Sequence, residues 1–565
     1  MKRFTAAVCF AALAAPTYLS SLEAPALPSQ EHVDLDVITR IRAEEFRHSK
    51  VMDTASELMD RIGPRLTGSP QVKAANEWTR KQFADWGLSN AHLESWGPFG
   101  RGWYYEKCAV RMTAPDHAEL LALPSAWTPG TNGVVKAAVV RLDIKSKDEL
   151  DALKGQFAGK IVLYGEMPKM EDHVKPEVER YDDKTLADVY KYEAPGRPRR
   201  FNREEFIKRR ELKTAVEKFL ENEKPLAIIE SGRGDLGTFY VQGGGEWKKA
   251  KPMAKTPDLS MESEHFGRIA RLLDRGVPVE LELDVVTHTI DEDQMQSNTI
   301  AELPGGDRKD EVVMIGAHLD SWHGGTGATD NGAGSIVVME AMRILKSLGV
   351  KPRRTIRAAL WTGEEQGLYG SKAYVEQHFA SRPPQTAEEA DQPWYRQKEK
   401  WPLTPKPEHA KLAAYFNLAN GSGRIRGIYC EDNAGVVPIF EAWLSPFHDL
   451  GATTVTMNRT TGTDHESFDR VGLPGFQFIQ DALDYETRTH HSNMDLYERL
   501  DKDDLMEASV IMATFAYEAA MRDAMLPRKP LPTEESERRE DPTPAAAKRG
   551  TPTPGPAPTA TPGPH

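Results

Sequence analysis

Two apolar runs near the middle of the chain constrain its fold most, because polar residues follow directly after each run. Val312–Ala317 is a short apolar run typical of a buried strand, and His318 stands at its carboxyl end. Thr355–Trp361 predicts a second strand, with Glu364 and Glu365 just beyond it. Ligands of open α/β sheets bind at the carboxyl ends of strands. The sequence therefore predicts an α/β fold with a polar site at this sheet edge.

A turn and a helix connect these two predicted strands. Asp330 stands in a Gly-rich turn, within Thr-Asp-Asn-Gly, and apolar residues then recur at helical spacing from Val337 to Leu348. This strand–turn–helix–strand order brings Asp330 to the same edge as the residues that follow the strands.

The residue types at this edge favour a metal site. One histidine and several carboxylates without thiolates suit zinc, and manganese or cobalt less selectively. Asp320, two residues after His318, points to the same side of a strand and can fix the imidazole tautomer. Asp330 can bridge two ions, and one of Glu364 and Glu365 can bind metal while the other acts as general base. Each residue alone reads as an ordinary loop residue, but the whole set favours a metal site.

The three stretches Gly-Ala-His-Leu-Asp, Thr-Asp-Asn-Gly and Gly-Glu-Glu resemble motifs of the dinuclear-zinc exopeptidase family. That family holds secreted aminopeptidases, plasma glutamate carboxypeptidase and glutaminyl cyclases. The resemblance runs from about residue 35 to about residue 525 and implies a mixed sheet flanked by helices. It also implies that His318 binds the first metal, Asp330 bridges both, Glu364 is the general base and Glu365 binds the second metal.

The chain departs from this family pattern at one metal ligand. The strand predicted at Lys411–Leu418 usually ends in Asn-x-Asp, whose aspartate is the third ligand of the first metal, but here Ala419 stands in its place. Asn417 and Asn420 are nearby without occupying the matching position. The resemblance therefore implies an incomplete first site.

Two further motifs carry histidines. The last family ligand, in His-x-x-x-Asp, matches His491, whereas His490 lies outside that spacing and is expected to be structural. His465, in Gly-Thr-Asp-His-Glu-Ser, could bond a substrate carbonyl or the oxyanion, or could be a structural histidine satisfied by Asp464. The implied second site is complete, with ligands Asp330, Glu365 and His491. We expect one tightly held zinc ion and a second only at high added metal.

The start of the chain predicts export. Lys2 and Arg3 precede a mostly apolar run at Phe4–Ala15, which is typical of a secretory signal peptide ending near residue 24. We therefore expect a secreted or periplasmic protein. The run is too short to span a membrane, and no later stretch reaches about 18 apolar residues.

The rest of the sequence predicts a catalytic domain that is interrupted by an inserted domain. Helices at Val33–Gly63 and Gln71–Gly87, separated by a Pro- and Gly-rich break at Arg61–Pro70, resemble the start of the family's catalytic domain. The predicted parts are a signal peptide (1–24), the catalytic domain (33–114 and 291–526), an insert (115–290) and a disordered Pro- and Thr-rich tail (527–565). We call 33–114 with 291–526 the main domain, and 115–290 the inserted domain.

The inserted domain reads as β-rich and resembles a protease-associated domain. Its expected strands and helices are Val134–Leu142, Lys160–Tyr164, Ala227–Ser231, a charged, solvated helical stretch at Glu177–Glu223, and a strand–helix–strand at Pro257–Leu283. Gly243–Gly245 lacks the surroundings of a phosphate-binding loop and predicts a flexible turn. A passive spacer or lid is slightly favoured over substrate gating or partner binding, because no chemical motif lies in this domain.

Composition narrows the function class. The net charge of -13 argues against a general nucleic-acid binder. Cys108 and Cys430 lack the spacing of a zinc site, and their pairing stays open, as does the oligomeric state.

The expected function is a secreted zinc exopeptidase acting on peptides, with an aminopeptidase favoured over a carboxypeptidase or dipeptidase. A single-zinc glutaminyl cyclase and a secreted binding protein with weakened catalysis are the alternatives from other classes. The retained base Glu364 argues against a pure binding protein.

Overall fold

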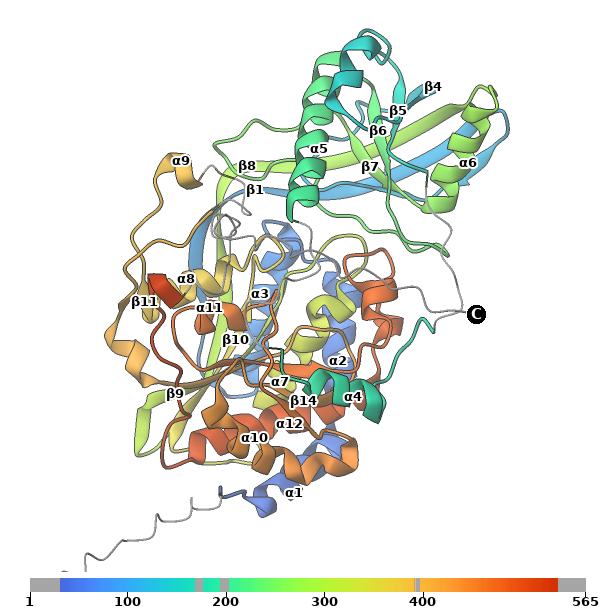
Figure 1. Cartoon of the computed structure of the whole chain (residues 1–565). Helices are drawn as coiled ribbons and strands as arrows, with labels where there is room; N and C mark the ends of the chain where they lie inside the picture. The colour runs from blue at the N-terminus through green and yellow to red at the C-terminus, as the bar shows by residue number, and fades with distance from the viewer. Residues whose placement is uncertain (1–30, 168–175, 194–202, 391, 393–396, 537–565) are drawn as a thin grey trace, which may run out of the picture.

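The computed structural model describes residues 31–167, 176–193, 203–390, 392 and 397–536. The predicted signal peptide and most of the predicted tail lie outside these residues. Figure 1 shows the two domains, with the main domain below and the inserted domain above, joined by the long strands β1 (Ser89–Ala114) and β8 (Glu280–Leu303). No helix within the described ranges is long and apolar enough to cross a membrane.

A mixed sheet forms the centre of the main domain, as predicted. Its strand order is β15-β14-β16-β13-β9-β10-β8. The strands are β9 (Arg308–His318), β10 (Arg354–Trp361), β13 (Leu412–Asn417), β14 (Ile425–Tyr429), β15 (Thr454–Thr456) and β16 (Gly475–Gln480). Strands β10, β9, β13 and β16 run parallel, so their carboxyl ends meet at one edge.

Helices cover both faces of this sheet. The helices and turns of the main domain include α1 (Leu35–His48), α2 (Val51–Ser56), η1 (Glu57–Ile62), α3 (Pro70–Asp85), η3 (Ala328–Gly332), α7 (Ala333–Ser347), α8 (Tyr369–His378), α10 (Val437–Leu444), α11 (His465–Asp469), η8 (Tyr485–Thr489) and α12 (Lys502–Met521). Alternate residues of β9 enter opposite layers, because a strand points successive side chains to opposite faces. Val313 and Ile315 join the core with α7 and α12, whereas Met314 packs with α8 and α11.

Helix α12 departs from the sequence prediction. The sequence predicts an amphipathic helix at Asp501–Asp523, and the helix forms, but nearly all of its residues are buried. The helix lies between α1, α7 and the sheet, so little of its surface faces solvent.

The inserted domain continues the same sheet. Its strands follow β8 in the order β4-β5-β6-β7-β3. Its elements are β2 (Ala118–Leu120), β3 (Ala122–Pro124), β4 (Val135–Leu142), η2 (Lys147–Leu153), β5 (Ile161–Tyr164), α5 (Arg203–Glu223), β6 (Ala227–Ser231), β7 (Asp258–Met261) and α6 (Ser263–Asp274). Strands β1 and β8 pair antiparallel and extend through both domains. The predicted boundary at residue 290 therefore falls inside a continuous strand.

Part of the charged stretch 177–223 is not a solvated elaboration of the inserted domain. Residues 176–193, including α4 (Asp183–Tyr190), return to the main domain. Arg180 forms ion pairs with Asp481 and Asp504 there, and Thr456 donates a hydrogen bond to the carbonyl of Val189. Only α5 behaves as predicted, as a helix of the inserted domain.

Candidate metal centre

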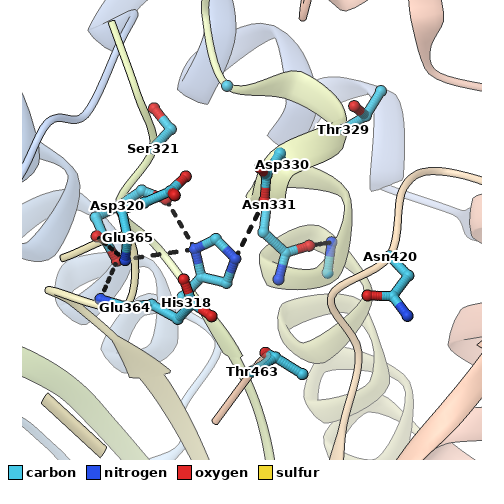
Figure 2. A network of polar contacts seen from close by, with 12 residues as sticks. His318, Asp320, Ser321, Thr329, Asp330, Asn331, Glu364, Glu365, Asn420 and Thr463 are labelled. Atoms are coloured by element: carbon cyan, nitrogen blue, oxygen red, sulfur yellow. Dashed lines mark hydrogen bonds and ion pairs between the residues drawn. The ribbon is translucent and has the colours of Figure 1, made fainter. Parts of the chain in front are cut away.

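His318 and Asp330 meet at the carboxyl edge of the sheet. His318 is the last residue of β9, and Asp330 lies in η3, the turn that leads into α7. His318 Nε2 lies 3.3 Å from Asp330 Oδ1, and both side chains are buried. Figure 2 shows His318 between Asp320 and Asp330, with Glu364 and Glu365 beside it.

The other oxygen of Asp330 faces a second histidine. His491 Nε2 lies 3.1 Å from Asp330 Oδ2 and 2.9 Å from Glu365 Oε2. The two oxygens of Asp330 are therefore directed at His318 and His491 respectively, which is the arrangement expected of a carboxylate that bridges two sites. The structure brings these four predicted ligands together.

The donor atoms fit zinc. Asp330 Oδ2 and Glu365 Oε1 are buried and accept no well-aligned hydrogen bond among the described residues, although His491 lies close to the first of them. Buried carboxylate oxygens without donors are costly unless a cation is bound. Donor atoms of His318, Asp330 and Glu365 lie within 4.8 Å of one another. Imidazole and carboxylate ligands in this number suit zinc.

Asp320 has a different role from the predicted one. His318 Nδ1 lies 3.0 Å from the backbone carbonyl oxygen of Asp320 and 3.8 Å from its carboxylate. The carbonyl, rather than the carboxylate, is thus placed to orient the ring. The carboxylate instead accepts hydrogen bonds from the hydroxyl of Thr67 and from the backbone N–H groups of Glu364 and Glu365.

The electrostatics of Glu364 suit a general base. Loss of hydration raises the pKa of the Glu364 carboxyl well above its usual range. His318 opposes this shift, whereas Asp464 and Glu365 add to it. A cation bound beside this group would lower its pKa again.

His465 does not reach the candidate ligands. It is completely buried at the start of α11, with Nε2 3.3 Å from the carbonyl of Thr460 and 3.5 Å from Glu431. The predicted contact with a substrate oxyanion therefore does not fit this position. Asp464 does not satisfy His465 either, because Nε2 of the ring faces Thr460 and Glu431 and Nδ1 has no hydrogen-bond partner within the described chain.

Asp464 is closer to the centre than the sequence suggested. Burial raises the pKa of Asp464 to about 7, against the opposing charge of His318. The Asp464 carboxyl also contributes to the raised pKa of Glu364. It is therefore a buried acid next to the proposed base.

The position of Ala419 leaves the first site without its usual aspartate. Asn417 cannot replace it, because its Oδ1 accepts from Tyr415 and its Nδ2 donates to Thr463. Figure 2 shows Asn420 on the far side of Asp330 and Asn331 from the two glutamates.

His490 lies nearer to the centre than expected. Its Nε2 is 3.9 Å from Asp330 Oδ2, and donor atoms of Asp330, His490 and His491 fall within 4.8 Å of one another. The ring also stacks on Tyr485, with ring centroids 4.7 Å apart. This packing is consistent with the predicted structural role, while the distance makes His490 a weaker candidate ligand.

Two residues support the centre in roles that the sequence interpretation did not predict. Arg65, in the predicted break, is completely buried and donates to the carbonyls of Leu319 and Gly327. Asp495 accepts hydrogen bonds from the backbone of Thr329 and Asp330. The only available signal for Asp495 was its place in the His-x-x-x-Asp motif, and Arg65 had none.

Known proteins share this sequence pattern and fold. Residues 298–516 match the model of peptidase family M28. Carboxypeptidase Q from Bos taurus is 26% identical over 476 residues, covering 83% of this chain and 85% of the relative. A peptidase M28 precursor from Shewanella amazonensis has the same fold, with a TM-score of 0.61, 23% identity and coverage of 88% of this chain and 99% of that one.

A zinc aminopeptidase from Bacillus subtilis also shares the fold, with a TM-score of 0.51 and 17% identity over 84% of this chain and 95% of that one. The family model covers the strands, turns and helices that carry His318, Asp330, Glu365 and His491. Residues 298–516 therefore form a peptidase family M28 domain, and the chain is a metallo-exopeptidase.

Proposed function

We propose that the chain is an aminopeptidase that uses zinc held by Asp330, Glu365 and His491, with Glu364 as general base. The observation that carries this proposal is His491 Nε2 lying against both Asp330 and Glu365, beside buried carboxylate oxygens that lack donors. Three protein ligands with one open position is the usual form of a catalytic zinc site.

The residues of the chain divide the chemistry between them. When bound, zinc supplies Lewis acidity, which lowers the pKa of a water molecule and polarises a carbonyl group. Glu364 accepts the proton of the attacking water and returns it to the leaving amine. Asp320 holds the backbone of Glu364, so the carboxylate stays aimed into the site.

The charge of the site supports recognition of a free amino terminus. The carboxylates around the centre are Asp320, Asp330, Glu364, Glu365, Asp464 and Asp495. Within the described chain, the ion pairs of Asp330 and Glu365 involve histidines only. Arg65 is a buried cation, but its N–H groups already serve backbone carbonyls. Even with one bound dication, this excess of acidic groups favours an ammonium group over a substrate carboxylate.

The relatives named carboxypeptidase Q favour a second candidate, cleavage at the carboxyl end. One peptide in three forms separates these two activities: with both ends free, with an acetylated amino end, and with an amidated carboxyl end. Loss of cleavage on acetylation alone supports the aminopeptidase, and loss on amidation alone supports the carboxypeptidase. Loss with either block indicates a dipeptidase.

We also propose that the protein holds one zinc ion tightly. The first site has His318 and Asp330 but no aspartate at Ala419, and a second dication next to the first is disfavoured by charge repulsion. Isothermal titration calorimetry of the metal-free protein with zinc should show one tight binding step and a much weaker second binding step.

Export is a further part of the proposal. It rests on the basic and apolar start of the sequence, which lies outside the described residues. Mass measurement of the mature chain from the medium or periplasm of expressing cells tests it, because a retained amino terminus would contradict signal-peptide removal.

A further inference from the structure

One residue of the inserted domain contacts a candidate metal ligand directly. Gln242 lies in the connection between β6 and β7, and its side-chain Nε2 is 2.9 Å from His491 Nδ1. His491 presents its other nitrogen, Nε2, to Asp330 and Glu365. The two nitrogens of one ring thus face the inserted domain on one side and the candidate ligands on the other.

The backbone around Gln242 is fixed to the same histidine segment. Val241 donates a hydrogen bond to the carbonyl of His491, and Asn493 donates to the carbonyl of Phe239. Phe239 also donates from its backbone to the side chain of Asn493, at 2.8 Å. Short strand-like pairing therefore joins residues 239–241 of the inserted domain to residues 491–493 of the main domain.

His491 needs such support because of its backbone. Its φ is +61°, in the left-handed region that residues with a side chain seldom adopt. Such conformations persist where the surrounding structure holds them in place. The pairing with residues 239–241 lies directly on this strained position.

Gln242 is itself held firmly. Its backbone carbonyl accepts a hydrogen bond from the backbone of Ala126, and Gly244 and Gly245 donate to the carbonyl of Ala126. A Cβ at Gly245 would lie 1.8 Å from the carbonyl oxygen of Trp127, so this loop is packed too closely for any other residue. The segment Gly243–Gly245, predicted to be a flexible turn, is thus a tightly packed support.

We propose that Gln242 is a positioning residue for His491 and that the inserted domain is a working part of the metal centre. An imidazole that binds a cation through Nε2 carries its proton on Nδ1. A half-turn of the Gln242 amide exchanges its oxygen and nitrogen, so that Oε1 accepts this proton. Such an acceptor fixes the ring and increases the basicity of the ligand.

The inference rests on the proposed metal centre, and zinc affinity is the direct test. Gln242→Met keeps the length of the side chain and removes the acceptor, so the Kd for zinc, measured by competition with a chromogenic chelator, should rise about 10–100-fold. Gln242→Glu keeps an acceptor and should bind zinc at least as tightly as the natural protein. Gln156→Met is the matched control, because Gln156 lies in the inserted domain and donates only to the carbonyl of Ala152 among the described contacts.

A spectroscopic measurement separates positioning from general damage to the fold. The cobalt-loaded Gln242→Met protein should show a changed visible absorption spectrum at saturating cobalt, whereas Gln242→Glu and Gln156→Met should keep the spectrum of the natural protein. Unchanged zinc affinity in Gln242→Met, or equal weakening in Gln242→Glu, would overturn the inference. A natural protein that binds no zinc would instead overturn the proposed metal centre.

Discussion

Asp320 Oδ1 lies 3.3 Å from the backbone nitrogen of Glu364. The other oxygen of the same carboxylate is 3.3 Å from the backbone nitrogen of Glu365. One buried acid after β9 therefore holds the turn after β10, where the proposed base and a candidate ligand stand next to each other. The position of Glu364 depends on its backbone and on Asp320 rather than on its own carboxylate.

Glu364→Gln should consequently keep the geometry and lose the chemistry. We expect peptide hydrolysis to fall by about 10²–10⁴-fold, the usual contribution of a general base. Zinc content, measured by elemental analysis, should stay at the natural value. Glu365→Gln is the comparison, because it should lose zinc and activity together. Loss of zinc in Glu364→Gln would show that the two roles are reversed.

The two adjacent histidines should differ in effect. His491→Ala removes the nitrogen that lies 2.9 Å from Glu365, so zinc content and activity should both fall strongly. His490→Ala should change zinc affinity little, because its Nε2 is 3.9 Å from Asp330 and its ring is partly exposed. Chelator competition on both variants ranks them, and the reverse ranking would identify His490 as the ligand.

Ala419→Asp should restore the usual aspartate of the first site. The added carboxylate gives His318 and Asp330 a third partner, so zinc bound per chain should rise toward two. Ala419→Asn, of similar size without the charge, is the control and should leave the stoichiometry near one. Two tight ions in the natural protein would refute the idea that the site is incomplete.

Glu45 provides a test that is independent of the metal. Burial and the hydrogen bond to Glu340 raise the pKa of Glu45 from 4.5 to about 9. The folded chain therefore keeps a proton that the unfolded chain releases between these values, and stability falls as pH rises through this range. Relative to Glu45→Gln, the natural protein should lose at most about 1.4 kcal/mol of unfolding free energy per pH unit.

Urea unfolding at pH 5, 7 and 9 measures this difference. Glu77→Gln, on an exposed part of α3, is the matched control. The difference in unfolding free energy between it and the natural protein should not change with pH. If the unfolding free energies of the natural protein and Glu45→Gln changed equally with pH, Glu45 would not be protonated in the folded state.

Arg65 should stabilise the loops next to His318 and Asp330. Arg65→Met leaves buried carbonyls of Leu319, Thr326 and Gly327 without donors, and we expect about 3–5 kcal/mol lower unfolding free energy. Arg61→Met, an exposed residue paired with Glu57, should change stability by less than about 0.5 kcal/mol. Thermal unfolding of the metal-free proteins compares them, and equal melting temperatures would contradict this role.

Local patterns were enough to predict the main elements. Strands β9 and β10, helix α7 and the candidate ligands His318, Asp330 and Glu365 follow from apolar periodicity and from polar residues at strand ends. His491 was added by a motif. These residues could be predicted because each one lies next to its strand or helix in the sequence, so a local pattern is enough to place it.

Contacts between distant segments were decided only by the tertiary structure. The carbonyl rather than the carboxylate of Asp320 faces His318, His465 turns toward Glu431, and α12 is buried on nearly all sides. Gln242 meets His491 across 249 positions of the chain. Each of these outcomes depends on which surfaces pack together, and packing partners far apart in sequence leave no periodic pattern in either segment. The sequence therefore determined which residues stand at the sheet edge, and the folded chain determined what each of them touches.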